Sequence, residues 1–147
     1  MVTADNAARW LLNSNDILYG GGAAENISNM KLQKLLYYAQ GLHLALYDTP
    51  LFDDDIYAWE HGPVIPSIYK QYKANGANGI SEFNSPDSGF TRDDEYALEA
   101  TQDNFGQYSA WKLRNMTHEE TPWKVTALNH VIPKEIIQTY FKENYIQ

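Results

Sequence analysis

Four histidines are the residues of this 147-residue chain best suited to acid–base or metal chemistry. His43 projects from an apolar helical stripe, where a lone histidine is usually a hydrogen-bonded core residue, and His130 has no acidic neighbour in sequence. His118-Glu119-Glu120 is the densest titratable cluster, but it lacks the second histidine of a His-Glu-x-x-His zinc site. His61 and His118 would suit a small hydrolase only if the fold brought them into one pocket. We therefore expect no catalytic and no metal-binding residue, and the hydrolase is the weakest alternative.

Two other segments invite a ligand site, Asp53-Asp54-Asp55 and Gly20-Gly21-Gly22. A calcium loop alternates its carboxylates and contains a turn glycine, whereas these three aspartates are consecutive and Ile56 follows them. A phosphate loop follows a strand and ends in Gly-Lys-Ser/Thr, and the triple glycine has neither feature. We therefore expect Asp53-Asp54-Asp55 to form an acidic turn, with an electrostatic patch for a basic partner as the alternative. We expect Gly20-Gly21-Gly22 to be a flexible connector. No cofactor is expected.

The composition restricts the class of partner. Nineteen acidic residues against eleven basic ones give a net charge of -8, which argues against direct binding to nucleic acid or to an anionic membrane. The chain has no cysteine, so a disulfide framework and a thiolate nucleophile are excluded. It shows neither a membrane-length apolar run nor a signal-peptide pattern, so a cytoplasmic protein is predicted. Aromatic residues reach 14%, and we expect some of the eleven tyrosines at an interface.

The hydropathy pattern predicts one compact, mainly α-helical domain over residues 1–147, with about six helices. A helix over 28–47 begins at Ser28 and carries apolar residues on two sides, so we expect it at the centre of the domain. Gly41 lies where a neighbouring backbone could approach this helix closely. A short extended segment is predicted near residues 56–60. Other helices are predicted from Thr3 to about Asn15, from Pro66 to about Asn75, over 93–105 and 110–116, and from Pro133 onwards.

Three ordered blocks of unusual composition carry a resemblance that covers nearly the whole chain. They are Ile27-Ser28-Asn29-Met30-Lys31-Leu32-Gln33-Lys34-Leu35-Leu36-Tyr37-Tyr38-Ala39-Gln40-Gly41, then Ala58-Trp59-Glu60-His61-Gly62-Pro63-Val64-Ile65-Pro66-Ser67-Ile68-Tyr69, then Tyr108-Ser109-Ala110-Trp111-Lys112-Leu113 with Thr117-His118-Glu119-Glu120-Thr121-Pro122-Trp123. Together they resemble the Panacea domain, the neutralising domain of a large group of bacterial and phage-borne antitoxins. The resemblance implies a non-enzymatic antitoxin, in many relatives prophage-associated, that binds a cognate toxin encoded by a neighbouring gene.

Residue types within and beside these blocks give two sets of candidates. The first set would bind the partner, with tyrosines as exposed anchors and lysines as rim charges: Tyr38, Tyr69, Tyr72, Lys31 and Lys34. The alternative for the two lysines is a structural role, either at a surface edge of their helix or in pairing with carboxylates of the same chain. The second set would be architectural and perform no chemistry: Trp59, His61, Gly62, Pro63, His118 and Trp123. Within it, we expect His61 to satisfy a neighbouring backbone or carboxylate group.

Two further alternatives stay open at this point. The protein could be an adaptor that delivers the toxin to a protease, or a phage-associated interaction protein that has no toxin partner. The oligomeric state is also open, a homo-oligomer included. The loops Gly20–Glu25 and Ser81–Thr91 contain nothing recognisable, and such loops often carry binding specificity.

Overall fold

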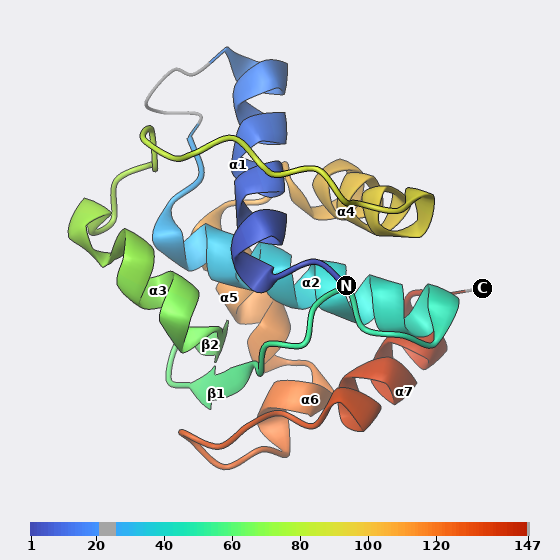
Figure 1. Cartoon of the computed structure of the whole chain (residues 1–147). Coiled ribbons are helices and arrows are strands. Elements are labelled where there is room, and N and C mark those ends of the chain that lie inside the picture. The colour runs from blue at the N-terminus through green and yellow to red at the C-terminus, as the bar shows by residue number, and fades with distance from the viewer. Residues whose placement is uncertain (21–25, 147) are drawn as a thin grey trace.

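The structure is a computed structural model that describes residues 1–20 and 26–146 (Figure 1). Within these ranges seven α-helices and one small antiparallel sheet confirm the predicted mainly α fold. The elements are α1 (Ala4–Tyr19), α2 (Asn29–Tyr47), β1 (Tyr57–Trp59), β2 (Gly62–Val64), α3 (Pro66–Tyr72), the 3₁₀ helix η2 (Lys73–Asn75), α4 (Arg92–Phe105), α5 (Ala110–His118), α6 (Thr121–Lys124) and α7 (Lys134–Asn144). No helix in the described part of the chain is both long and apolar enough to cross a membrane.

Helix α2 runs through the middle of the molecule and contacts α1, α3, α4, α5, α7 and β2 (Figure 1). It begins after Ser28, whose hydroxyl accepts the Lys31 N–H at 3.2 Å, as the capping pattern predicted. Fifteen of its nineteen residues are buried, so the prediction of a central helix packed from more than one side is confirmed. The ring of Phe141 in α7 lies where a Cβ of Gly41 would be. The missing side chain therefore allows α7 to dock.

Some element boundaries differ from the expected ones. Helix α1 continues to Tyr19 instead of ending near Asn15, because asparagine only weakly opposes a helix. The helix closes at Gly20, which adopts a left-handed conformation with φ 71°. Residues 21–25 of the glycine-containing loop lie outside the described residues. Helix α7 begins at Lys134, so that Pro133 occupies the N-cap and not the first helical position.

The predicted extended segment near residues 56–60 is strand β1, but its pairing was not predicted. Strand β2 runs antiparallel to it, with Tyr57 opposite Val64 and Trp59 opposite Gly62. Glycine and proline are unusual inside strands, so Gly62-Pro63 indicated a stiff connector rather than a strand. The hairpin leaves His61 exposed at its turn.

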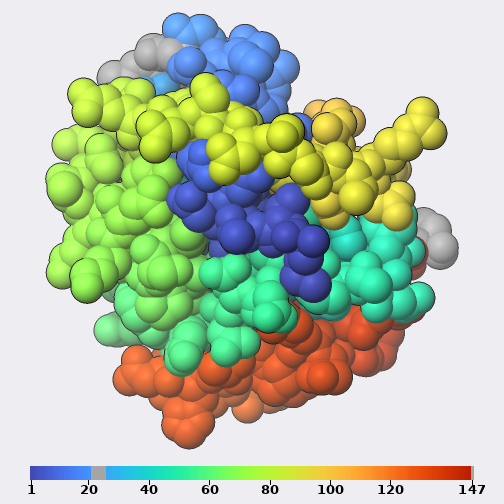
Figure 2. All heavy atoms as spheres, viewed as in Figure 1, coloured from blue at the N-terminus to red at the C-terminus, as the bar shows by residue number. Residues whose placement is uncertain are grey.

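The segment 81–91 forms the predicted loop, and it crosses the surface of α1 (Figure 2). Arg9 in α1 donates to the Ser85 carbonyl at 2.8 Å and pairs with the Asp87 carboxylate at 3.1 Å. Asn6 accepts the Asp87 N–H at 2.7 Å. These contacts connect the loop to α1, and Thr91 then caps α4.

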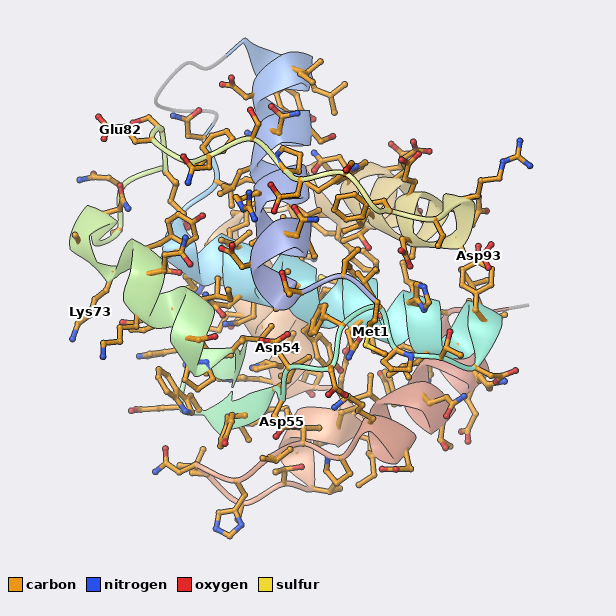
Figure 3. All side chains as sticks on the ribbon, viewed as in Figure 1. Met1, Asp54, Asp55, Lys73, Glu82 and Asp93 are labelled. Carbon is orange, nitrogen blue, oxygen red and sulfur yellow. The ribbon has the colours of Figure 1, made fainter. Side chains whose placement is uncertain are left out.

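The acidic turn Asp53-Asp54-Asp55 has partners inside the molecule. Figure 3 labels its Asp54 and Asp55 side chains. Asp54 accepts the N–H of Ala4 at 3.1 Å, at the start of α1, where a carboxylate is favoured by the helix dipole. Asp55 pairs with Lys134 at 3.4 Å, at the start of α7. The turn therefore connects the first and last helices through two of its three carboxylates.

Candidate partner-binding groove

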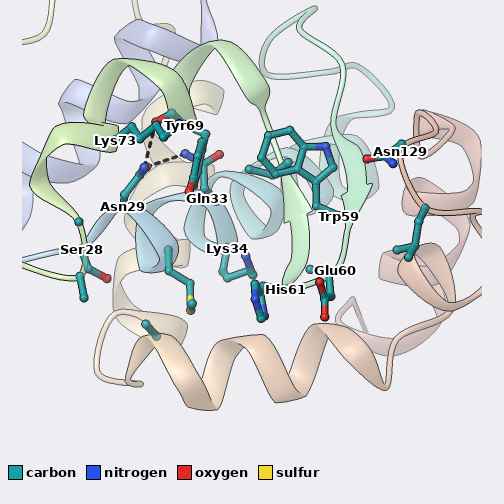
Figure 4. A pocket seen from close by; sticks show the side chains of 17 residues that line it. Ser28, Asn29, Gln33, Lys34, Trp59, Glu60, His61, Tyr69, Lys73 and Asn129 are labelled. Carbon is teal, nitrogen blue, oxygen red and sulfur yellow. Dashed lines mark hydrogen bonds between the residues drawn. The ribbon is translucent and has the colours of Figure 1, made fainter.

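Polar side chains of α2 position the hairpin and α3. The side-chain oxygen of Gln33 accepts the Ile65 N–H at 2.9 Å. Asn29 donates to the Tyr69 carbonyl at 2.9 Å and accepts from the Gln33 amide at 2.9 Å (Figure 4). Buried backbone groups need hydrogen-bond partners, and in this segment the partners are side chains of the central helix.

A groove of about 660 Å³ opens between α2, the hairpin turn and α3 (Figure 4). This volume is within the range of sites that hold a small molecule or a few side chains of a partner. The rings of Trp59 and Tyr69 meet edge to face, 5.3 Å apart, and form an aromatic wall. Other lining residues are Ser28, Asn29, Met30, Gln33, Lys34, Glu60, His61, Gly62, Val64, Lys73, Gly76, Ala77, Ala110, Leu128 and Asn129.

Lys34 lines this groove although its side chain is only 2% exposed. Its ammonium group donates to the Pro63 carbonyl at 3.3 Å, and no carboxylate in the described ranges pairs with it. Burial, and to a smaller extent the positive charge of Arg114, lowers the pKa of Lys34 to about 7. The site therefore contains a buried cation that gains and loses its proton near neutral pH.

Gly62 makes room for the Lys34 side chain. It has φ +118°, a conformation that side chains disfavour, and a Cβ there would lie 2.6 Å from Lys34 Cε and 3.0 Å from Thr117 Oγ1. Gly62→Ala is therefore expected to lower the free energy of unfolding by about 2–4 kcal/mol, measured by urea denaturation. Gly89→Ala is the matched control, since Gly89 has φ +112° with open space around it. Equal losses in the two variants would show that contact with Lys34 contributes nothing.

Arg114 in α5 connects the groove to an exposed tryptophan. Its Nε donates to His61 Nδ1 at 3.3 Å, and its guanidinium lies 4.6 Å from the centre of the Trp111 ring. Trp111 is 59% exposed. We call Trp111 and Arg114 of α5, together with His61 of the hairpin turn, the α5 row. The expectation that His61 satisfies a backbone or carboxylate group is wrong, because its ring accepts a hydrogen bond from Arg114 instead.

Sequence reasoning did not select Trp111 or Arg114 as site residues, although a signal was present. Leu113 and Thr117 are four apart in α5 and both are fully buried, so they define the inward face of the helix. Trp111 precedes Leu113 by two positions and therefore points away from that face. An outward tryptophan on a short helix is an indication of an interface.

His118 packs behind the hairpin and does not line the groove. Its ring stacks on Trp123 with centroids 4.0 Å apart, and the Trp123 indole donates to the Trp59 carbonyl at 2.8 Å. Burial, then the charge of Arg114, lowers the pKa of His118. The fold thus does not bring His61 and His118 together in the groove, which is the arrangement that the hydrolase alternative required.

The structure separates the five candidate partner-binding residues. Tyr69 and Lys34 line the groove. The expectation that Tyr38 and Tyr72 are exposed anchors is wrong, since Tyr38 is fully buried and Tyr72 is 5% exposed. Tyr38 lies on a helix that is covered from several sides, and Tyr72 faces the α1 side of α3. Lys31 donates to the Gly106 carbonyl at 2.6 Å and so contacts the end of α4.

Glu120 is a buried carboxylate surrounded by three tyrosines. Tyr37 donates to Oε1 and Tyr38 to Oε2, both at 2.9 Å, and Tyr145 donates to Oε2 as well. Burial raises the pKa of Glu120, while the three phenol hydrogen bonds act in the opposite direction. Burial also raises the pKa of each phenol. These groups satisfy one another, and the cluster therefore supports the packing of α2 on α6 and the C-terminal end of the chain.

Comparison with known proteins identifies the family. The sequence matches the family described as "Antitoxin SocA-like, Panacea domain" over residues 32–124. The chain belongs to this antitoxin family. A stretch of 54 residues is 46% identical to the Antitoxin SocA of Caulobacter vibrioides (strain NA1000 / CB15N). That stretch covers 37% of this chain and 29% of the curated relative. No solved structure matches the chain.

The SocA-like match includes most of the features described above. Residues 32–124 contain Lys34, both strands of the hairpin, the Tyr69 wall and the α5 row. Helices α1 and α7 lie outside the match, and both pack on α2. Twelve of the seventeen residues that line the groove lie within the match, and the other five lie just before or just after it.

Proposed function

We propose that this SocA-like protein neutralises a cognate toxin by direct, non-covalent binding at the groove and the α5 row. One observation carries the proposal. Trp111 is largely exposed, is flanked by a guanidinium, and connects through Arg114 and His61 to an aromatic-walled groove. Tryptophan, tyrosine and arginine are the residues most enriched among those that dominate binding energies. Their grouping beside a groove suits the docking of a protein.

Residues 1–147 are proposed to act as one antitoxin domain in the cytoplasm, beside a toxin encoded by a neighbouring gene. The central position of α2 supports this, because helices on both sides of the family match depend on it for their packing. Separate units would each need a core of their own.

The roles of the other buried titratable groups favour binding over catalysis. His43 lies between the Thr49 carbonyl and the Asp94 carboxylate, which is 2.9 Å from its Nε2, and it is the hydrogen-bonded core residue that its position predicted. Glu120 is occupied by phenols. In the described part of the chain no three His, Cys, Asp or Glu side chains are grouped so that they could hold a metal ion.

Trp111→Ala tests the docking surface. We expect the affinity for the product of the neighbouring toxin gene to fall by about 30-fold, because truncating a central aromatic anchor commonly costs about 2 kcal/mol. Affinity is measured by calorimetry on the purified complex, and neutralisation by growth rescue in cells that express the toxin. Tyr96→Ala is the matched control, because Tyr96 is 57% exposed but lies on α4, away from the groove. Equal effects of the two variants would contradict docking at this surface.

The same cells distinguish direct neutralisation from delivery to a protease. Direct binding predicts an unchanged amount of toxin when growth is rescued, whereas an adaptor lowers the amount of toxin. Rescue without any complex between the purified proteins would contradict direct neutralisation. Absence of a lethal neighbouring gene would support an interaction protein without a toxin.

A further inference from the structure

Basic groups gather around Lys34, some lining the groove and others behind it, in a chain whose net charge is -8. Around the Lys34 ammonium lie Arg114 and His118 of α5 and His61 of the hairpin turn. Glu60 is exposed at the rim of the groove and pairs with none of them in the part of the chain described. The side chains closest to the Lys34 ammonium are therefore basic, whereas the composition of the whole chain is acidic.

Lys34 is also incompletely satisfied. An ammonium group has three donors, and the Pro63 carbonyl accepts one hydrogen bond from it. Burying a cation without a counter-ion is unfavourable, and an opposing charge with hydrogen-bonding capacity removes most of that cost. Several carboxylates elsewhere in the protein are paired with lysine or arginine, but none of them is near Lys34. Within residues 1–20 and 26–146, no carboxylate supplies this counter-ion, and a partner could supply it.

We propose that the groove receives an Asp or Glu side chain from the bound protein, and that its carboxylate pairs with the Lys34 ammonium. The inference rests on the proposed function in taking the occupant to be a segment of the toxin. The apolar walls of the groove determine which residues should flank the acidic residue in the bound segment. Trp59, Tyr69 and Leu128 line the same groove, so the acidic residue should be flanked by apolar or aromatic residues.

A defined pH dependence follows from this pairing. The pKa of Lys34 is about 7 in the free protein, so the charged form falls from most of the molecules at about pH 6 to a minority at about pH 8. Only the charged form attracts a carboxylate. The affinity for an acidic segment should therefore fall by about tenfold over that interval. Lys34→Met should abolish this dependence, whereas a dependence caused by His61 or His118 would persist in the variant.

The test uses peptides and needs no knowledge of the toxin. A phage-displayed library of random peptides is selected on the purified full chain at about pH 6. Enriched peptides should share one acidic position flanked by apolar residues. A synthetic peptide of that sequence should lose about tenfold or more in affinity when its acid is replaced by the amide, and equally when the protein carries Lys34→Met. Lys70→Met is the control, since Lys70 is an exposed α3 residue outside the groove.

Two results would overturn the inference: selected peptides without a shared acid, or equal peptide affinity for the wild type and for Lys34→Met with both proteins folded by circular dichroism. Lys34→Gln, which retains a donor for the Pro63 carbonyl, should behave like Lys34→Met. A third result separates this inference from the proposed function. If peptide binding depends on Lys34 while Lys34→Met binds and neutralises the toxin normally, the pairing of Lys34 with the toxin is wrong, and Trp111→Ala still decides whether the toxin docks at this surface.

Discussion

Glu120→Ala is expected to lower the free energy of unfolding by about 3–5 kcal/mol. The substitution removes the acceptor of three phenols, of which those of Tyr37 and Tyr38 are fully buried. Each buried donor left without a partner costs about 1–3 kcal/mol, and a cavity adds to this cost. Water entering the cavity would recover part of the loss, so the three costs do not add fully. The expected total is still a large share of the stability of a typical domain.

Urea denaturation of the wild type and the variant measures this loss. Glu119→Ala is the matched control, because Glu119 is the adjacent carboxylate in sequence and is exposed. Its effect should stay within about 0.5 kcal/mol. A loss below about 1 kcal/mol for Glu120→Ala would mean that the phenols do not depend on this carboxylate.

Local sequence signals were sufficient for the main elements. Ser28 is a good N-cap, Pro66 suits the first turn of a helix, and apolar residues on two sides of 28–47 require a buried central helix. These features act within one or two turns of chain, so periodicity and capping are enough to detect them. The same reasoning interpreted Gly41 as a position where a neighbouring backbone approaches the helix. The group that approaches is instead the Phe141 side chain.

The candidate site was harder to predict, because burial depends on what packs against a helix. Lys34 and Tyr38 were treated as surface residues of α2, as their types favour. Both are buried, since the hairpin, α5 and the C-terminal end of the chain cover the side of α2 that carries them. The partners of these residues are distant in sequence: Pro63 for Lys34 and Glu120 for Tyr38. Periodicity assigns a residue to a side of a helix and does not show what covers that side.

One sequence signal for the tyrosine cluster was available and was not used. Tyr37 and Tyr38 are consecutive on a helix that was expected to be covered on two sides. Buried phenols need acceptors, so a carboxylate elsewhere in the chain had to reach them. Glu120 was considered only as part of a titratable cluster with His118. The unusual composition of the first and third blocks therefore reflects, in part, a buried polar contact between them.

Lys34→Met is expected to stabilise the free protein most at low pH, with a benefit that declines as the pH rises. The folded-state pKa of Lys34, about 7, lies below the usual lysine value of 10.5. Between these two values the unfolded chain binds a proton that the folded chain releases, so the wild type gains stability as the pH rises, by about 1.4 kcal/mol per unit. Methionine keeps the stem of the side chain without the charge. The stability difference between the two proteins should therefore change by about 4 kcal/mol from pH 7 to about pH 10.5.

Denaturation curves across this interval measure that difference, and Lys70→Met, exposed on α3, should follow the wild type at every pH. A constant difference would mean that Lys34 has an ordinary pKa and that its burial costs little. At low pH the benefit of Lys34→Met is reduced by about 1–3 kcal/mol, because the Pro63 carbonyl loses its donor. Lys34 thus destabilises the free protein. Such a residue is best explained by a role in a complex, since binding and catalytic sites commonly reduce the stability of the protein that carries them. Greater stability and weaker binding in the same Lys34 variant would therefore identify the cation as a binding group.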